Sequence, residues 1–353
     1  MDLNNLVLGI LIIAFSLFFY GYFLRILGKY HPALLIDREL NKPQAFHESP
    51  TSIAGGIGLF FSFLIVYFNF ALFKTTFYFE YLSFCTLFFL LGLLDDFKIN
   101  IYPKIRLALM ITFLIILVKY NNFYIENTGI EILNNLLNDY KFFSLFFVCL
   151  CFLFIINGAN LIDGYNGLLG IHSLIILINL FFVNYLNQNY NLADLIFFGI
   201  LFLTMFLIFN FPKGKLFLGD SGSYFLGSFI SISIIETSLA NPNVSPFYFC
   251  ILLFYLFFEV FFSFFRKLIK EKTSPLYPDR KHLHMIAYSM LLKQNNNKLK
   301  SNYFISVIIN FVYLILIIPA IFMMKDGLFC KYYSLIFFTI YIFAYKLIHE
   351  KTK

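Results

Sequence analysis

Five short polar clusters interrupt an otherwise apolar sequence, and each carries side chains that could bind or react. They are Lys42–Thr51 with Gly55 and Gly56 after it, Gly92–Asp96, Asn157–Gly167, Phe217–Ser223 and Pro278–His284. Carboxylates and amides dominate the middle three, whereas arginine, lysine and histidine dominate the last. This mixture indicates a site that holds a hard cation together with an anionic ligand.

Asp95 and Asp96 end an apolar stretch of the sequence. Adjacent carboxylates repel each other, so a cation or a basic partner is expected nearby. Neighbouring positions do not share a helix face, but at a frayed helix end the two side chains could still converge. We predict a base or a metal site here, and the alternative is a solvated turn where the chain leaves the membrane.

Asn157, Asn160, Asp163 and Asn166 recur at every third position. A helix would place them as a slowly drifting stripe on one side, and their oxygens suit Mg²⁺. The alternative is a set of helix caps. Asp220 has the same two interpretations, since it could be a metal ligand beside a phosphate-attracting helix N-terminus or a plain N-cap.

Arg280, Lys281, His282 and His284 form a compact group of hydrogen-bond donors. Phosphate contacts are expected, because arginine binds phosphate through two parallel hydrogen bonds. Zinc is a weaker interpretation, since no cysteine is near the two histidines, and a basic loop against lipid headgroups is the third. Glu259 lies inside an apolar stretch, where a buried acid indicates either function or a structural ion pair.

The composition decides which elements must position these clusters. Of 353 residues 60% are hydrophobic and 13% charged, which excludes a soluble globular domain and a disordered chain. The apolar runs are continuous, which excludes an outer-membrane barrel. The five cysteines show no C-x-x-C spacing and fit apolar packing. We predict one all-α membrane domain over residues 1–353, with spans near 6–27, 53–73, 77–94, 103–119, 142–157, 167–186, 192–211, 217–236, 246–268, 302–323 and 331–348.

The distribution of positive charge predicts the orientation of these eleven spans. With the N-terminus outside and the C-terminus in the cytoplasm, 21 Lys and Arg residues fall on the cytoplasmic side and 5 on the other. The net charge of +7 is then a topology signal, and no nucleic-acid partner is expected. All five polar clusters fall on the cytoplasmic side, which predicts a single site there.

Four motifs occur in a recognisable order: G-L-L-D-D, N-G-A-N-L-I-D-G-Y-N-G-L, F-L-G-D-S-G-S and P-D-R-K-H-L-H. Through them the chain resembles, over almost its full length, the polyprenyl-phosphate N-acetylhexosamine-1-phosphate transferases of MraY and WecA type (glycosyltransferase family 4). The resemblance implies a bacterial inner-membrane bundle of ten or eleven helices. It also implies transfer of a sugar 1-phosphate from a UDP-N-acetylhexosamine to undecaprenyl phosphate, with release of UMP. The expected cofactor is Mg²⁺, for which Mn²⁺ could substitute.

The resemblance also implies roles for individual positions. These are catalytic for Asp95, Asp96, Asp163 and His282; substrate-binding for Asn157, Asn166, Arg280, His284, Lys42 and His47; and metal-binding for Asp220 and Asn160. The acidic pair would handle the lipid phosphate, Asn166 would contact uracil, and the Arg280 loop would lie near the diphosphate and sugar. The expected partners are undecaprenyl phosphate, the UDP-sugar, membrane lipid and a second copy in a homodimer.

Two departures from the pattern bear on the substrate. Asn166 stands where many bacterial relatives have Asp, and H-L-H-M replaces a run of three histidines. We therefore expect initiation of O-antigen, capsule or another surface polysaccharide, ahead of the phospho-MurNAc-pentapeptide transfer of peptidoglycan synthesis. A transporter is the alternative from a different class, but the acids gather on one face and the sequence shows no convincing repeat.

Overall fold

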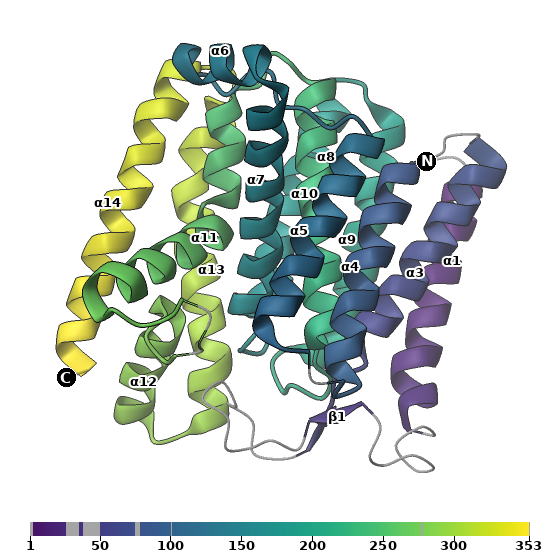
Figure 1. Ribbon diagram of the computed structural model, residues 1–353. Coiled ribbons are helices and arrows are strands. Elements are labelled where there is room, and N and C mark those ends of the chain that lie inside the picture. The colour runs from purple at the N-terminus through teal and green to yellow at the C-terminus, as the bar shows by residue number, and fades with distance from the viewer. Residues whose placement is uncertain are drawn as a thin grey trace.

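The chain folds into a bundle of long helices, most of them running between its two ends (Figure 1). The computed structural model describes residues 3–25, 35–37, 50–74, 78–99, 101–275, 277 and 279–352. The long helices are α1 (Leu3–Phe18), α3 (Gly55–Asn69), α4 (Phe79–Asp96), α5 (Pro103–Tyr120), α7 (Lys141–Ile162), α8 (Leu168–Leu186), α9 (Tyr190–Asn210), α10 (Gly219–Ala240), α11 (Pro246–Phe265), α13 (Lys298–Phe322) and α14 (Gly327–Thr352). Each coincides with one predicted span. Turns of π-helix extend α1, α3 and α11 as η1 (Phe19–Phe23), η2 (Phe70–Lys74) and η3 (Arg266–Glu271).

Within the described ranges, nine helices are long and apolar enough to cross a bilayer. The prediction of an all-α, multi-pass membrane protein is therefore confirmed. The two long helices outside this set are α4 and α5, which have 18 residues each. Each carries three charged residues, and among these Asp95 and Asp96 of α4 and Arg106 of α5 belong to the carboxylate cluster described below. The count of eleven spans stays a prediction.

Two shorter helices lie between the predicted spans. They are α6 (Glu131–Asp139) and α12 (Leu283–Asn295). Figure 1 places α6 across one end of the bundle, and α12 and β1 (Ile36–Asp37) at the other end. Strand β1 pairs antiparallel with β2 (Thr51–Ser52), and Ser52 also bridges to Leu216. The strands thus join the segment before α3 to the loop before α10.

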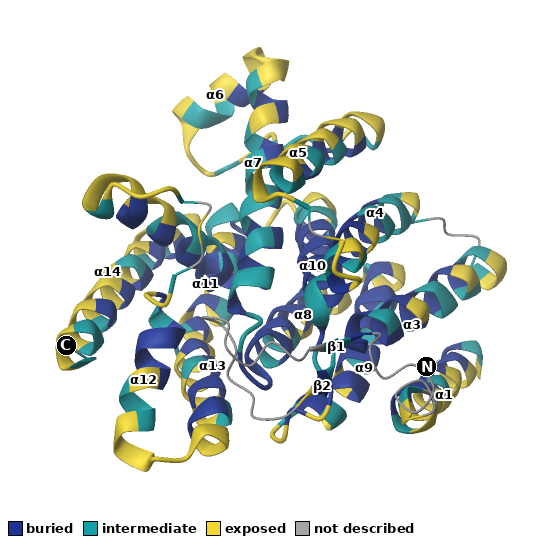
Figure 2. Ribbon diagram, turned by 60° about the horizontal axis from the view of Figure 1, so that its bottom comes forward, coloured by how far each residue is buried: buried dark blue, intermediate teal, exposed yellow. Residues whose placement is uncertain are grey.

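Helix α10 is the centre of the bundle and is buried over most of its length. It packs on α3, α4, α7 and α8 (Figure 2). Small residues allow this approach. A Cβ added to Gly56 of α3 would lie 2.3 Å from the Gly222 nitrogen, and one added to Gly92 of α4 would lie 2.4 Å from the Asp220 carbonyl oxygen. Between membrane helices, such backbone contact supplies van der Waals attraction that burial from water cannot supply.

A glycine contact between α7 and α11 gives a test of this packing. A Cβ on Gly158 would lie 2.1 Å from the Leu256 carbonyl oxygen, so the two backbones must separate in Gly158→Ala. We expect this variant to lose about 1–3 kcal/mol of stability through overpacking. Gly9→Ala in α1 is the matched control, because its nearest neighbour is a Leu201 side-chain atom at 3.8 Å. Thermal unfolding in detergent compares them, and an equally stable Gly158→Ala variant would show that this contact is not tight.

Candidate functional site

The N-terminus of α10 is held by a carboxylate from another helix. Asp96, at the end of α4, accepts hydrogen bonds from the backbone N–H of Asp220 at 2.8 Å and of Ser221 at 3.0 Å. Gly219 turns the chain with a φ of +74°, and a Cβ there would lie 2.7 Å from an Asp96 oxygen. Asp96 therefore caps α10. The alternative in which Asp220 is merely the N-cap of its own helix is wrong.

The Asp220 side chain points instead toward α7. One of its oxygens accepts from the Asn160 amide at 2.8 Å, and the same amide lies 3.0 Å from the Ser223 hydroxyl. The other Asp220 oxygen lies 4.0 Å from Arg106. The structure thus brings together Asn160 and Asp220, the two residues predicted to bind a metal.

Asp95 and Asp96 point in different directions. Asp95 forms an ion pair with Arg106 at 2.6 Å, whereas Asp96 is buried against α10. Arg106 is a site residue that the motifs did not indicate, since it was counted only among the 21 cytoplasmic Lys and Arg residues. One signal could have revealed it: Arg106 stands near the N-terminus of α5, where the helix dipole disfavours a cation. A cation placed there needs an anionic partner.

Asp163 brings a third helix to the cluster as the C-cap residue of α7. Burial raises the pKa of Asp163 well above its usual range, and the charges of Asp220 and Asp96 raise it further. Burial and then Asp220 also raise the pKa of Asp96 to about 7, although the two backbone N–H groups oppose this rise. Three carboxylates from α4, α7 and α10 therefore lie within electrostatic reach of one another.

The oxygen atoms of this cluster could serve as ligands for a divalent cation. Among the residues that the structure describes, no three His, Cys, Asp or Glu side chains lie close enough to enclose a metal ion. Mg²⁺, however, is commonly bound through one or two carboxylates while water and substrate phosphates complete its shell. The contact between Asn160 and Asp220, with acids crowded beside it, fits that kind of site.

The four residues of the predicted stripe, Asn157, Asn160, Asp163 and Asn166, do not share one face of a helix. Helix α7 ends at Ile162, so only Asn157 and Asn160 are helical. Asn157 donates to the Leu153 carbonyl at 2.8 Å and faces the Met110 sulfur of α5 at 4.0 Å. Asn166 is buried and donates to the Pro212 carbonyl at 2.9 Å. The stripe prediction is therefore wrong beyond Asn160, because the helix stops before the next two members.

The two histidines, His282 and His284, lie at the same end of the bundle and are buried. Asp279 and Glu259 flank His282, at 3.4 and 3.2 Å from its two ring nitrogens. Nδ1 of His284 lies 3.3 Å from the Tyr255 hydroxyl, and burial lowers the pKa of His284 to about 4, so this ring is neutral at pH 7. Arg280, between these anchors, is exposed.

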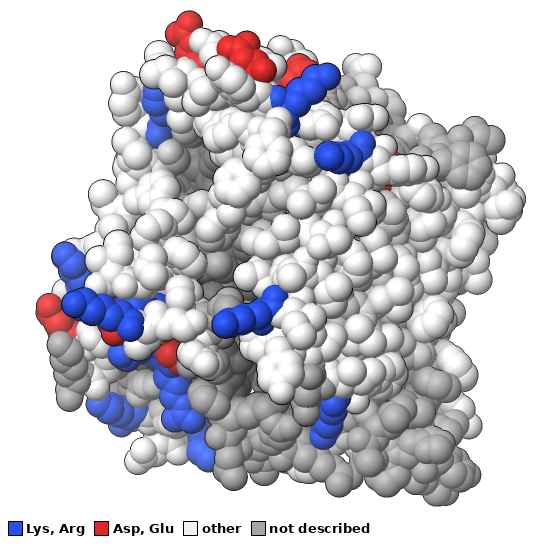
Figure 3. Space-filling model, in the orientation of Figure 1, with Lys and Arg blue, Asp and Glu red and all other residues white. Residues whose placement is uncertain are grey.

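Tyr165 connects the two histidines to the carboxylate cluster. The ring of His284 meets the edge of the Tyr165 ring with 5.8 Å between centroids, and Tyr165 follows Asp163 by two positions. Figure 3 shows Lys and Arg side chains on both sides of a hollow in the lower half of the molecule. Lys42 and His47, the remaining predicted site residues, lie outside the described residues.

Comparison with known proteins supports the resemblance drawn from the motifs. Residues 78–238, which contain Asp95, Asp96, Arg106, Asn160, Asp163 and Asp220, match the glycosyl transferase family 4 model. The chain is 40% identical over 201 residues to the phospho-N-acetylmuramoyl-pentapeptide-transferase of Dictyoglomus turgidum, covering 54% of this chain and 61% of that protein. It is 31% identical over 198 residues to the undecaprenyl-phosphate alpha-N-acetylglucosaminyl 1-phosphate transferase of Thermotoga maritima, covering 56% and 57%.

A third relative is the undecaprenyl-phosphate alpha-N-acetylglucosaminyl 1-phosphate transferase of Escherichia coli O157:H7, which is 25% identical over 201 residues. The matches to these relatives span about three fifths of their length or less. The two kinds of relative share transfer of a phospho-sugar and differ in the sugar that their names state. Residues 78–238 thus match glycosyl transferase family 4, and the chain is similar to relatives of the MraY and WecA type.

Proposed function

We propose that this protein transfers an N-acetylhexosamine 1-phosphate from a UDP-sugar to undecaprenyl phosphate, giving the undecaprenyl-diphospho-sugar and UMP. The reaction would initiate a cell-surface polysaccharide at the cytoplasmic face of the bacterial inner membrane. The observation that carries this proposal is the meeting of Asp95, Asp96, Asp163 and Asp220 with Arg106 at one end of a membrane bundle. Such a cluster can hold two phosphorylated substrates only with a cation beside it.

We assign the cation site to Asp220 and Asn160, which are already in contact. When bound, Mg²⁺ would neutralise charge on the donor diphosphate, and Mn²⁺ could take its place. Asp163 lies close enough for a cation to relieve the repulsion by Asp220 and Asp96, which adds to burial in raising its pKa. Helix α10 would contribute its dipole, although two of its first N–H groups are already taken by Asp96.

The acceptor phosphate would lie on the α5 side of the cluster. Arg106 is the cation there, and its side chain is 30% exposed. It could bind an incoming phosphate if Asp95 releases the guanidinium group or shares it with the phosphate. Asp96 would act through α10, which it caps, because both of its oxygens are engaged by backbone N–H groups. The polyprenyl tail would remain in the bilayer.

A second candidate is phospho-MurNAc-pentapeptide transfer, which the 40% identity to the D. turgidum protein favours. The deciding experiment uses purified protein with Mg²⁺, undecaprenyl phosphate, and either UDP-MurNAc-pentapeptide or one of a panel of UDP-N-acetylhexosamines. We expect UMP release with one UDP-N-acetylhexosamine, and only when the lipid phosphate is present. Release with the pentapeptide donor alone would establish the second candidate, and no release with any donor would refute both.

The metal assignment is tested by Asp220→Asn. The amide keeps the shape and can still accept the Asn160 hydrogen bond, but the charge is lost. We expect UMP release to fall by orders of magnitude while folding survives, because the metal's stabilisation of transition-state charge is lost. The control is Asp326→Asn, the same change before α14, where the side chain accepts from the Phe329 N–H. Near wild-type turnover of Asp220→Asn at saturating Mg²⁺ would remove Asp220 from the metal site.

The proposed orientation is tested by cysteine labelling in intact cells. Asn295→Cys lies beside the end of α12 and Glu126→Cys lies before α6, at the opposite end, and both positions are exposed. We expect an impermeant maleimide to label Glu126→Cys at once and Asn295→Cys only after lysis, with wild type as the background. The reverse pattern would place the carboxylate cluster outside, away from any cytoplasmic UDP-sugar.

A further inference from the structure

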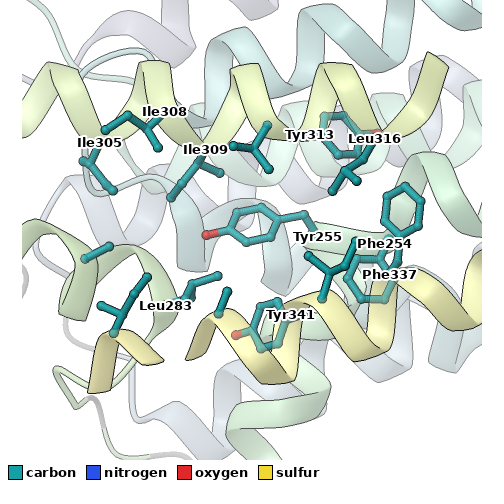
Figure 4. A pocket seen from close by; sticks show the side chains of 15 residues that line it. Phe254, Tyr255, Leu283, Ile305, Ile308, Ile309, Tyr313, Leu316, Phe337 and Tyr341 are labelled. Carbon is teal, nitrogen blue, oxygen red and sulfur yellow. The ribbon is translucent and has the colours of Figure 1, made fainter. Parts of the chain in front are cut away.

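Glu259 is a fully buried acid inside an apolar helix. It lies in α11, and its side chain is 1% exposed. Beside it Tyr255, Leu283 and Tyr341 line an apolar pocket between α11, α12, α13 and α14 (Figure 4). A carboxylate in such surroundings is costly unless hydrogen bonds compensate it, so its partners indicate its purpose.

Glu259 makes close contacts with the start of α12, and the side chains of Tyr255 and Tyr341 also interact with it. One oxygen lies 3.2 Å from Nδ1 of His282, the N-cap residue, and the other accepts from the Leu283 backbone N–H at 3.2 Å. His284 lies 3.8 Å from the second oxygen, and its ring is stacked on His282 with 5.6 Å between centroids. Glu259 therefore caps α12 and fixes both histidines.

The anchoring continues from His282 to the turn that carries Arg280. The other ring nitrogen of His282 lies 3.4 Å from Asp279, which also accepts from the Lys281 backbone N–H at 3.1 Å. Asp279 forms a further ion pair with the buried Arg266 at 2.7 Å. The residues on both sides of Arg280 are thus fixed, while the Arg280 side chain itself is exposed.

This turn lies beside the Asp163 side of the carboxylate cluster. Burial and Tyr288 raise the pKa of Tyr165 well above its usual range, and the nearby charge of Arg280 opposes that rise. Tyr165 also packs on Tyr288 of α12 with 5.1 Å between ring centroids. A cation at this position could bind a diphosphate held next to Asp163.

We propose that Glu259 is the positioning residue of the active site: by capping α12 and clamping His282, it holds Arg280 where it binds the diphosphate of the donor. His282, with both ring nitrogens facing carboxylates, transmits this constraint and does not itself contact substrate. The inference rests on the proposed function, since the anion that Arg280 meets is the donor's diphosphate.

The test is Glu259→Gln, which keeps the volume but replaces one accepting oxygen by an NH₂ group, so it cannot accept from both His282 and Leu283. We expect KM for the UDP-sugar to rise about tenfold or more, as when a hydrogen bond to a charged group is lost. kcat and KM for undecaprenyl phosphate should change little. The matched control is Glu236→Gln, a second glutamate within the bundle, near the opposite end of α10, which should leave every constant unchanged.

A double variant separates positioning from a general effect on folding. Arg280→Ala alone should raise KM for the donor, and adding Glu259→Gln should then have little further effect, because both changes remove the same contact. The proposal would be overturned if the rises in donor KM of the two single variants multiply in the double variant. It would also be overturned if Glu259→Gln leaves KM unchanged. If Glu259→Gln does not fold, Asp279→Asn gives the same test, because it loosens the turn from outside the core.

The two proposals fail in different ways. Absence of UMP release by the wild type with every donor would refute the proposed function. The positioning role would then be decided by calorimetry with UDP and Mg²⁺, where Glu259→Gln and Arg280→Ala should weaken binding to the same extent. UDP affinity that falls in Arg280→Ala but not in Glu259→Gln would refute the positioning role.

Discussion

The hydrogen bonds from the first residues of α10 to Asp96 are the interaction on which the site depends. Helix α10 is buried from its first turn, so its N–H groups have little access to water and need acceptors within the protein. Asp96 supplies two of them from a position 124 residues earlier in the chain. This contact fixes α4 against α10, and it brings the acidic end of α4 beside Asp220.

The close approach that permits this contact has an electrostatic consequence. Glycines at 56, 92 and 222 let α3, α4 and α10 meet at backbone distance, so the carboxylates of α4 and α10 cannot move apart. Arg106 offsets part of the repulsion through its pair with Asp95. Burial, and then the charges of neighbouring carboxylates, raise the pKa values of the remaining acids, Asp96 and Asp163. The proposed cation would relieve the part of this rise that comes from repulsion.

Both α10 and α12 are capped by a carboxylate from a neighbouring helix. Asp96 caps α10 from α4, and Glu259 caps α12 from α11. In each case a buried carboxylate satisfies backbone N–H groups that a local Ser, Thr or Asn would ordinarily satisfy. The start of each capped helix is thereby tied to a neighbouring long helix. Asp220, in the first turn of α10, and Arg280, just before α12, then have fixed backbones; the Asp220 side chain contacts Asn160 and the Arg280 side chain is exposed.

The sequence by itself determined the membrane class, the position of every long helix and the order of motifs that indicates the family, because hydrophobic length and local motifs are properties of short segments. Only the tertiary structure decided that Asp95 and Asp96 diverge and that Arg106 belongs to the cluster. It also decided that Asn160 contacts Asp220 while Asn157 faces α5. Helices that are apolar on all sides carry no periodic signal for which face meets which neighbour. Their rotation is decided by small-residue contacts between distant segments, so the direction of each polar side chain emerges only when the bundle is packed.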